Sequence, residues 1–301
     1  MRTSDYLQLI WRGIKMAFLR DKTPILGTII LTDKCNLECK HCATHDYAER
    51  TSTYKQTLSE MQRLYDLGVR ILFFSGGETT LWRDENANKS LDDLLNDARK
   101  MGFLIINFVT NGTQRLDYPE ADLILLSVDG DKETHNKIRG DCFDTILDTL
   151  DRDKPNNICL YPALNNMNSH TLDFLCEFAQ NHPHIQGISF NFHTPYPGTE
   201  HLAFTHKEID LLCKRILEHH NAGVKMFNLP MTFKKISKSK IKPCNQCVVI
   251  EDGKLSECAR CKHIPGLCEK CGYLFVHEFN SIFRGNPKAL WQMHKIFRQF
   301  V

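Results

Sequence analysis

Strand-like and helix-like segments alternate along the sequence between Ile25 and Gly223. Six apolar segments have the length and composition of buried strands: Ile25–Leu31, Val69–Phe74, Phe103–Val109, Ala121–Val128, Asn157–Ala163 and Ile185–Phe192. Amphipathic segments between them are typical of helices, and glycines stand where several of these helices should end. Strands that are joined through helices become parallel, with the helices outside. Because eight such units close a barrel, six predict an α/β fold with a partial, open (βα)6 barrel.

Three cysteines lie close together directly after the first predicted strand. Cys35, Cys39 and Cys42 have the spacing Cys-x3-Cys-x2-Cys. Three thiolates can hold three irons of a cubane iron–sulfur cluster, which four thiolates usually ligate. The fourth iron then stays open, as in catalytic metal sites that keep a free coordination position. From the residues alone, a zinc site or a group of reduced thiols is the alternative.

The second predicted strand ends in a glycine-rich segment with an acidic residue, namely Gly76, Gly77 and Glu78. Paired glycines allow a close approach of the backbone, and a carboxylate can accept hydrogen bonds from an ammonium group. The cysteine loop and this segment together resemble the radical S-adenosylmethionine (SAM) superfamily. The resemblance implies that the three cysteines hold a [4Fe–4S] cluster. It also implies that the Gly-Gly-Glu segment holds the amino group of SAM. His41 stands where the family usually has an aromatic ring.

The same resemblance implies the fold, the reaction and a partner. The fold is a partial TIM-type barrel, which we place over residues 23–232. In the reaction, a reduced cluster donates an electron to the sulfonium of SAM, and the resulting 5′-deoxyadenosyl radical attacks the substrate. A reductant such as flavodoxin or ferredoxin is the implied partner.

Polar residues follow the third and fourth predicted strands. Asn111 follows the third strand, in a segment that lines the cofactor site in relatives; a plain loop is the alternative. Ser127 and Asp129 follow the fourth strand, and His135 to Arg139 come soon after. This stretch is similar to one in peptide-modifying radical SAM enzymes. The similarity implies that Ser127 and Asp129 approach the ribose and methionyl parts of SAM. It also implies that Arg139 pairs with the methionine carboxylate, which its planar fork matches.

The sixth predicted strand runs into a segment with two prolines and a glycine. These residues end the strand at the barrel mouth, where Asn191, His193 and Tyr196 would form a wall on the substrate side. A structural turn is the alternative. No residue is assigned a catalytic role from the sequence.

Six more cysteines form three Cys-x2-Cys pairs in the segment 233–301, which we call the cysteine-rich segment and which ends in a predicted helix over 286–301. The pairs are Cys244/Cys247, Cys258/Cys261 and Cys268/Cys271. They indicate a zinc site or an auxiliary iron–sulfur cluster, and the resemblance favours the cluster. Position and cysteine content resemble SPASM or twitch extensions, although the spacing departs from the seven-cysteine SPASM pattern. The four isolated cysteines, among them Cys142 and Cys213, are expected in the core.

Charge and cysteine usage exclude several classes of function. A net charge of +2 provides no strong basic field, so we expect no nucleic-acid partner. Grouped cysteines favour metal binding in a reducing compartment over a disulfide framework. With no signal peptide and no apolar segment of membrane-spanning length, the expected location is cytoplasmic.

The first 22 residues form a separate predicted element. Residues 6–20 predict an amphipathic helix with Trp11 on its apolar face and basic residues around it. Such a helix could contact a membrane surface, which would make the protein peripheral at the inner membrane. The alternative is that the helix packs against the bottom of the core.

Three functions remain open at this point. The N-terminal helix resembles that of the hopanoid-pathway radical SAM enzyme, so our first hypothesis is modification of a C–H or C=C group in an apolar, isoprenoid-like substrate. The second hypothesis is a SPASM-type peptide or protein maturase, which the Asp129–Arg139 stretch and the cysteine-rich segment favour. The third is a non-catalytic iron–sulfur or zinc protein.

Overall fold

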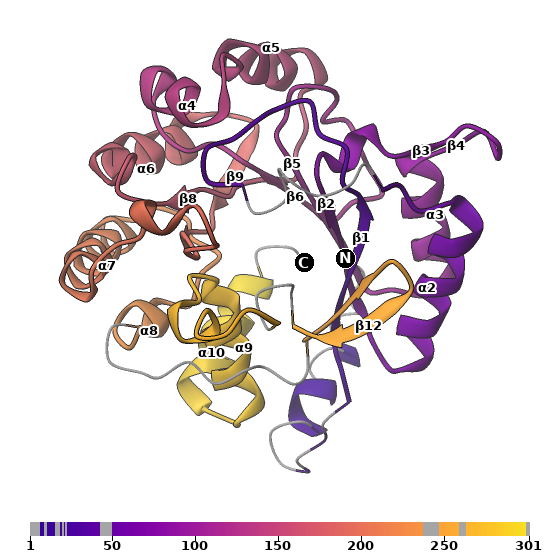
Figure 1. The fold of residues 1–301 in the computed structure, drawn as a ribbon. Helices are drawn as coiled ribbons and strands as arrows, with labels where there is room; N and C mark the ends of the chain where they lie inside the picture. The colour runs from indigo at the N-terminus through magenta and orange to yellow at the C-terminus, as the bar shows by residue number, and fades with distance from the viewer. Residues whose placement is uncertain are drawn as a thin grey trace.

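A computed structural model describes residues 7–8, 11–15, 19, 21, 23–42, 50–236, 247–258 and 263–298. An eight-stranded sheet with the order β12-β11-β1-β2-β5-β6-β7-β9 forms its centre. Six of these strands correspond to the predicted ones: β1 (Leu26–Thr32), β2 (Ile71–Gly76), β5 (Ile105–Thr110), β6 (Leu123–Leu126), β7 (Ile158–Leu160) and β9 (Ile185–Ile188). Neighbouring members of this set pair in parallel. The sheet curves around the centre of Figure 1, which confirms the partial TIM-type barrel.

Helices cover the outer face of this sheet (Figure 1). In chain order they are α2 (Tyr54–Asp66), α3 (Leu91–Met101), α4 (Lys132–Arg139), α5 (Phe143–Asp153), α6 (Leu172–Asn181) and α7 (His206–Asn221). Three shorter or later helices follow: α8 (Pro230–Phe233), α9 (Leu274–Phe283) and α10 (Pro287–Phe297). Gly102 closes α3 in the left-handed conformation, and Thr205 and Glu208 form a capping box at the start of α7.

Residues alternate between the two faces of each strand. In β1, Ile29 and Leu31 pack into the core beneath the helices, whereas Thr28 and Ile30 face the inside of the barrel. The register places Thr28 beside Phe73 of β2, and Phe73 beside Asn107 of β5. The inner face thus carries a few polar side chains among apolar ones, and the outer face is apolar.

The cysteine-rich segment extends the barrel sheet, which was not predicted. β11 (Cys247–Glu251) pairs in parallel with β1, and β12 (Lys254–Glu257) pairs with β11 in the antiparallel sense. In Figure 1, α9 and α10 lie on the open side of the barrel between β12 and α8. The division into a barrel over 23–232 and a separate segment over 233–301 stays a prediction.

Two predicted segments have a different local structure. The stretch from His135 to Arg139, for which no helix was predicted, belongs to α4, where Asp131 accepts a hydrogen bond from the Thr134 amide at 2.9 Å. The predicted strands over 157–163 and 185–192 are each interrupted. Their last residues form a second small sheet from β8 (Ala163–Leu164) and β10 (Asn191–Phe192). Another small sheet pairs β3 (Arg83–Asp84) with β4 (Lys89–Ser90).

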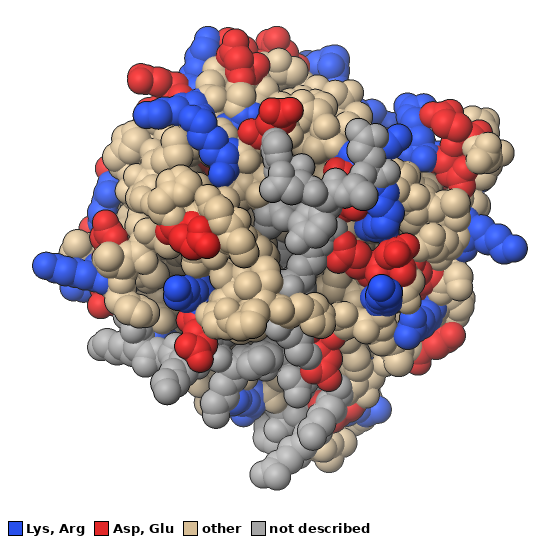
Figure 2. All heavy atoms as spheres, in the orientation of Figure 1, with Lys and Arg blue, Asp and Glu red and all other residues tan. Residues whose placement is uncertain are grey.

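Only parts of the predicted N-terminal helix belong to the described residues. Leu7, Trp11, Ile14 and Leu19 are all exposed there, with 57% of Trp11 accessible. In the described part of the chain, the helices are too short or too polar for one of them to span a bilayer. Acidic and basic side chains are interspersed over the coloured part of the face in Figure 2. The four isolated cysteines, including Cys142 and Cys213, are buried, which confirms their place in the core.

Candidate active site

The cysteine loop packs directly on the end of β2. Gly77 donates a backbone hydrogen bond to Thr32 at 2.7 Å, and Glu78 donates one to Lys34 at 2.8 Å. A Cβ atom on Gly76 would overlap with the Thr32 carbonyl, and one on Gly77 would overlap with that of Lys34. The two glycines therefore let the backbone of the cysteine loop lie against the strand. Their predicted contact with SAM stays a prediction.

Glu78 joins the ends of β2 and β5. It is 1% exposed, and its Oε1 accepts hydrogen bonds from the hydroxyls of Thr80 (2.6 Å) and Thr110 (2.7 Å). Its Oε2 accepts the Asn111 amide at 2.7 Å. Because the protein itself orients both oxygens, this carboxylate is a fixed acceptor at the edge of the sheet that carries the cysteines.

Asn111 connects β5 to the cysteine loop. Its Nδ2 donates to the side chain of Asn36 at 2.9 Å, and Asn36 lies between Cys35 and Cys39. The Asn36 Nδ2 in turn donates to Thr113 at 2.8 Å. Asn111 therefore belongs to an ordered network that fixes the loop, and not to a plain turn. The sequence did not indicate Asn36 or Thr113.

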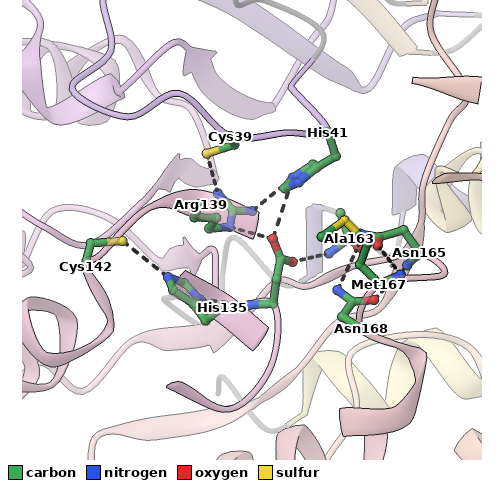
Figure 3. A network of polar contacts seen from close by, with 10 residues as sticks. Cys39, His41, His135, Arg139, Cys142, Ala163, Asn165, Met167 and Asn168 are labelled. Atoms are coloured by element: carbon green, nitrogen blue, oxygen red, sulfur yellow. Dashed lines mark hydrogen bonds and ion pairs between the residues drawn. The ribbon is translucent and has the colours of Figure 1, made fainter. Parts of the chain in front are cut away.

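A buried ion pair forms the centre of the network in Figure 3. Arg139 on α4 donates through Nε to Asp129 Oδ2 at 2.5 Å. Asp129 is fully buried, and its Oδ1 accepts the Ala163 amide at 2.8 Å. Burial acts to raise the pKa of Asp129, but Arg139, His41 and the Ala163 amide outweigh it and the pKa is lowered. Asp129 is therefore a carboxylate that holds a buried cation in place.

The Arg139 guanidinium also points toward the cysteine loop (Figure 3). Its Nη1 lies 3.9 Å from the sulfur of Cys39, and its Nη2 lies 3.4 Å from Nε2 of His41. Burial is the main cause that lowers the pKa of His41 to about 4; Asp129 acts to raise this pKa, and Arg139 acts to lower it. His41 is therefore neutral. Its Nδ1 is buried and has no hydrogen-bond partner in the described ranges. In this structure Arg139 pairs with Asp129, and its predicted pairing with the carboxylate of SAM stays a prediction.

His135 contacts the backbone of Asp129 and so supports the ion pair of Asp129 and Arg139. Its Nδ1 accepts the backbone amide of Asp129 at 3.2 Å, so the proton sits on Nε2, which lies 3.4 Å from the sulfur of Cys142. Burial first, and Arg139 second, lower the pKa of His135 to about 4. His135 thus fixes the backbone of Asp129 beside the site. Ser127 is buried at the same edge and donates its backbone amide to Thr110.

The three predicted substrate-side residues fall at the same barrel mouth. Asn191 and His193 are buried, and Asn191 Oδ1 accepts the amide of Leu274 from α9 at 3.1 Å. The His193 ring packs edge-on against His41, with 6.3 Å between centroids. Tyr196 is also buried and lines the cavity inside the barrel. The wall is therefore adjacent to the cysteine loop.

Four of the six cysteines in the cysteine-rich segment belong to the described residues; Cys244 and Cys261 lie outside them. Cys258 donates its amide to the Cys247 carbonyl at 3.1 Å. Burial raises the pKa of Cys271 to about 12; a hydrogen bond from the Tyr273 backbone opposes this, and Cys258 and Cys268 raise the pKa further. No three His, Cys, Asp or Glu side chains within the described ranges converge tightly enough to ligate one metal ion.

Gly272, directly after Cys271, packs against the substrate-side wall. Its amide donates to the Thr194 hydroxyl at 3.0 Å, and its carbonyl accepts the amide of Phe192 at 3.0 Å. A Cβ at this position would overlap with the Phe192 carbonyl. Only glycine permits this approach, so the cysteine-rich segment is docked on the barrel mouth.

Comparison with known proteins relates this arrangement to a family. Among curated proteins, the chain is similar to the antilisterial bacteriocin subtilosin biosynthesis protein AlbA of Bacillus subtilis (strain 168). The two are 30% identical over 128 residues, which cover 39% of this chain and 27% of AlbA. The sporulation killing factor maturation protein SkfB of the same organism is 31% identical over 131 residues, which cover 39% of this chain and 29% of SkfB. The chain therefore spans less than a third of each curated relative.

Solved structures extend the likeness to the fold of nearly the whole chain. Streptococcus suis SuiB bound to S-adenosylmethionine matches with a TM-score of 0.62 at 14% identity, over 94% of this chain and 72% of SuiB. Native anSMEcpe with bound AdoMet matches with a TM-score of 0.59 at 18% identity, over 91% of this chain and 96% of that one. The family model described as the Radical SAM superfamily matches residues 29–179, which are half of the chain and include the cysteine loop. The chain belongs to the radical SAM superfamily.

Proposed function

We propose that this enzyme cleaves SAM at a cluster held by Cys35, Cys39 and Cys42, and that its substrate is a peptide. The observation that carries the site assignment is the ion pair of Asp129 and Arg139, because it places a buried cation beside the sulfur of Cys39. The choice of a peptide is supported by the relatives, two of which are named for bacteriocin biosynthesis and for maturation of a killing factor.

The residues present fit an iron–sulfur cluster and SAM. Burial raises the pKa of the Cys39 thiol to about 11, Arg139 opposes this, and Cys42 and Cys35 raise it further. Three mutually repelling thiolates need cationic charge, which iron supplies. The unpartnered Nδ1 of His41 and the fixed carboxylate of Glu78 offer polar contacts at the same edge. When bound, the cluster and SAM together supply the 5′-deoxyadenosyl radical.

The protein's own residues then have distinct proposed roles. Glu78, Gly76 and Gly77 hold the amino end of SAM, and Asn111 keeps the cysteine loop in register with them. Ser127 and Asp129 line the ribose and methionyl side. Arg139, oriented by Asp129, provides positive charge for the SAM carboxylate. As in other radical SAM enzymes, an external electron donor is required, for which we propose flavodoxin or ferredoxin.

The cysteine-rich segment is proposed to hold an auxiliary iron–sulfur cluster. Cys247, Cys258, Cys268 and Cys271 are the described candidates, together with Cys244 and Cys261. The docking of Gly272 on Phe192 brings the adjacent Cys271 close to the segment of Asn191 and His193, where an auxiliary cluster could contact substrate or relay electrons. Iron–sulfur is favoured over zinc because the enzyme already depends on iron–sulfur assembly.

The comparisons favour the peptide hypothesis over the lipid hypothesis. The two curated relatives are named for bacteriocin biosynthesis and for maturation of a killing factor, and one similar structure is of SuiB bound to the precursor peptide SuiA. The exposed apolar residues of the N-terminal helix remain the observation in favour of a lipid surface. Contact with the membrane through residues 6–20 therefore stays a prediction.

The proposed function is tested by anaerobic reconstitution followed by iron and sulfide analysis and dithionite-driven SAM cleavage. We expect 5′-deoxyadenosine from the wild-type protein and none from variants with alanine at Cys35, Cys39 or Cys42. Cys213→Ala is the matched control, because Cys213 is buried on α7 away from the loop. Incubation with short peptides encoded near the gene, read by mass spectrometry, tests the substrate class. A modified isoprenoid and an unchanged peptide would reject the peptide hypothesis.

A further inference from the structure

A cavity of about 870 Å³ occupies the inside of the barrel. This volume lies in the range of small-ligand sites. Its wall is mainly apolar and includes Phe73 from β2 and Phe279 from α9. Gly76 and Tyr196 line it at the end that carries the cysteine loop, so the cavity reaches the site of chemistry.

Two carboxyl groups of the cysteine-rich segment, Glu251 and Glu278, line this cavity, and Glu278 is the buried one. Glu278 on α9 is 7% exposed and lines the cavity. Its Oε1 accepts the Leu229 amide at 2.8 Å and the Asn228 Nδ2 at 3.3 Å. Asn228 is itself fixed, because its Oδ1 accepts the Phe190 amide at 2.6 Å. One edge of the carboxyl group is therefore anchored to the barrel, and the rest of the group is available to the cavity.

Glu278 has no cationic neighbour in the described part of the chain. Burial raises its pKa to about 7, and only the hydrogen bonds from Leu229 and Asn228 oppose this effect. A buried carboxyl group without a cation is costly to ionise. Its environment therefore favours a ligand that brings a positive charge or a strong hydrogen-bond donor.

Tyr161 is the second polar group at this place. It lines the cavity, and the carbonyls of its neighbours Leu160 and Pro162 accept the amides of Ser189 and Asn191. Phe190, between those two residues, donates its amide to Asn228, which also donates to Glu278, so Tyr161 and Glu278 are held on neighbouring segments. Tyr161 follows β7 directly, and Ala163, two residues later, donates its amide to Asp129. The pair of Glu278 and Tyr161 is thereby linked to the ion pair beside Cys39.

We propose that Glu278 and Tyr161 bind a basic side chain of the substrate, such as a lysine, inside the barrel cavity. The apolar walls accommodate the methylene stem, and the carboxyl and phenol oxygens accept hydrogen bonds from the amine. This inference rests on the proposed peptide substrate and assigns Glu278 a role in specificity.

The test is calorimetric titration of the full-length, cluster-loaded enzyme with SAM bound and without reductant. The two probes are N-acetyl-lysine methylamide and N-acetyl-norleucine methylamide, which share a similar stem and differ in the ammonium group. We expect the lysine probe to bind about tenfold more tightly or better, because charge-assisted hydrogen bonds are lost with norleucine. Glu278→Gln removes this preference, and Tyr161→Phe reduces it.

Glu60→Gln is the matched control. Glu60 is also buried and also accepts a backbone amide, that of Gly253 at 3.0 Å, but it does not line the cavity. This variant retains the preference for lysine.

Equal affinity of the two probes for the wild-type enzyme, no measurable binding of the lysine probe, or an unchanged preference in Glu278→Gln would overturn the inference. If Glu278→Gln fails to fold, the affinities of the two probes for the wild-type enzyme and for Tyr161→Phe still test the inference. Absence of SAM cleavage by the wild-type enzyme would instead reject the proposed function, and the binding experiment does not depend on it.

Discussion

The two groups of cysteines differ in what surrounds them. Cys39, in the first loop, lies beside the Arg139 guanidinium and a neutral histidine, with Asp129 behind them. The pKa of Cys271, in the cysteine-rich segment, is raised mainly by burial, and Cys258 and Cys268 raise it further. A permanent positive charge close to one group stabilises negative charge there, on thiolates or on a reduced cluster. We therefore expect the first loop to be the electron-accepting, SAM-cleaving centre.

The largest effect should come from removing a cysteine in each group. Cys39→Ala is expected to abolish 5′-deoxyadenosine formation, because the cluster loses one of three protein ligands. Cys271→Ala should lower the iron content but leave reductive cleavage of SAM detectable. Product analysis by chromatography and iron counts on both variants provide the measurement. Cleavage that disappears only with Cys271→Ala would reverse the assignment of the two groups.

The next effect concerns the charge beside the first loop. Asp129→Asn leaves Arg139 buried without its carboxylate and should cost about 3–5 kcal/mol in free energy of unfolding. Asp173→Asn is the control, since Asp173 pairs with Arg215 at an exposed site and should cost about 1 kcal/mol or less. Denaturant titration of the two variants measures the difference. Similar losses in both would show that the buried pair does not govern stability.

A pH-dependent effect on stability is expected from Glu278, which lies in the cysteine-rich segment. Because its pKa is raised from 4.5 to about 7 in the folded state, its contribution to stability is fully present below pH 4.5 and is lost as the pH rises through about 7. The loss amounts to about 3 kcal/mol at most. Glu278→Gln should remove this part of the pH profile, measured as the free energy of unfolding at several pH values. An identical profile in the variant would contradict the buried, unpaired carboxyl group.

The smallest effect compares helix caps in the two regions. Asn286 accepts the amides of Lys288 and Ala289 at the start of α10, and Thr205 caps α7 in the barrel. Alanine at either position should cost about 1 kcal/mol. Since α9 and β11 are packed on the barrel, both variants should shift a single unfolding transition in calorimetry. Two separate transitions, each sensitive to one variant, would mean that the cysteine-rich segment unfolds independently.

The barrel was predictable because its signals are local. Strand segments, the glycine at the end of α3 and the capping box of Thr205 can be read from a few neighbouring residues. The site was predictable where residues directly follow strands, as for Cys35, Glu78 and Asp129. What the sequence did not indicate depends on long-range contacts. The pairing of β11 with β1 and the bond between Asn36 and Asn111 join residues far apart in the chain.

Two misses have specific physical causes. The helix α4 is short and polar, and its buried residues include His135 and Arg139, so it lacks the apolar stripe that marks a helix. Glu278 was not singled out, although it is the sole acidic residue in the apolar segment Leu274–Phe283. A lone carboxylate in such a segment is a recognisable signal, because charged residues are rarely buried without a partner.

The pairing of β1 with β11 has a consequence for biosynthesis. The strand that precedes the cysteine loop emerges from the ribosome long before its later neighbour, and until then one of its edges is unprotected. Non-local pairing of this kind slows folding and prolongs the exposure of such edges to aggregation. Iron and sulfide delivered to a nascent chain would reach it before the sheet is complete. Maturation of the holoenzyme should therefore be most efficient after translation has ended.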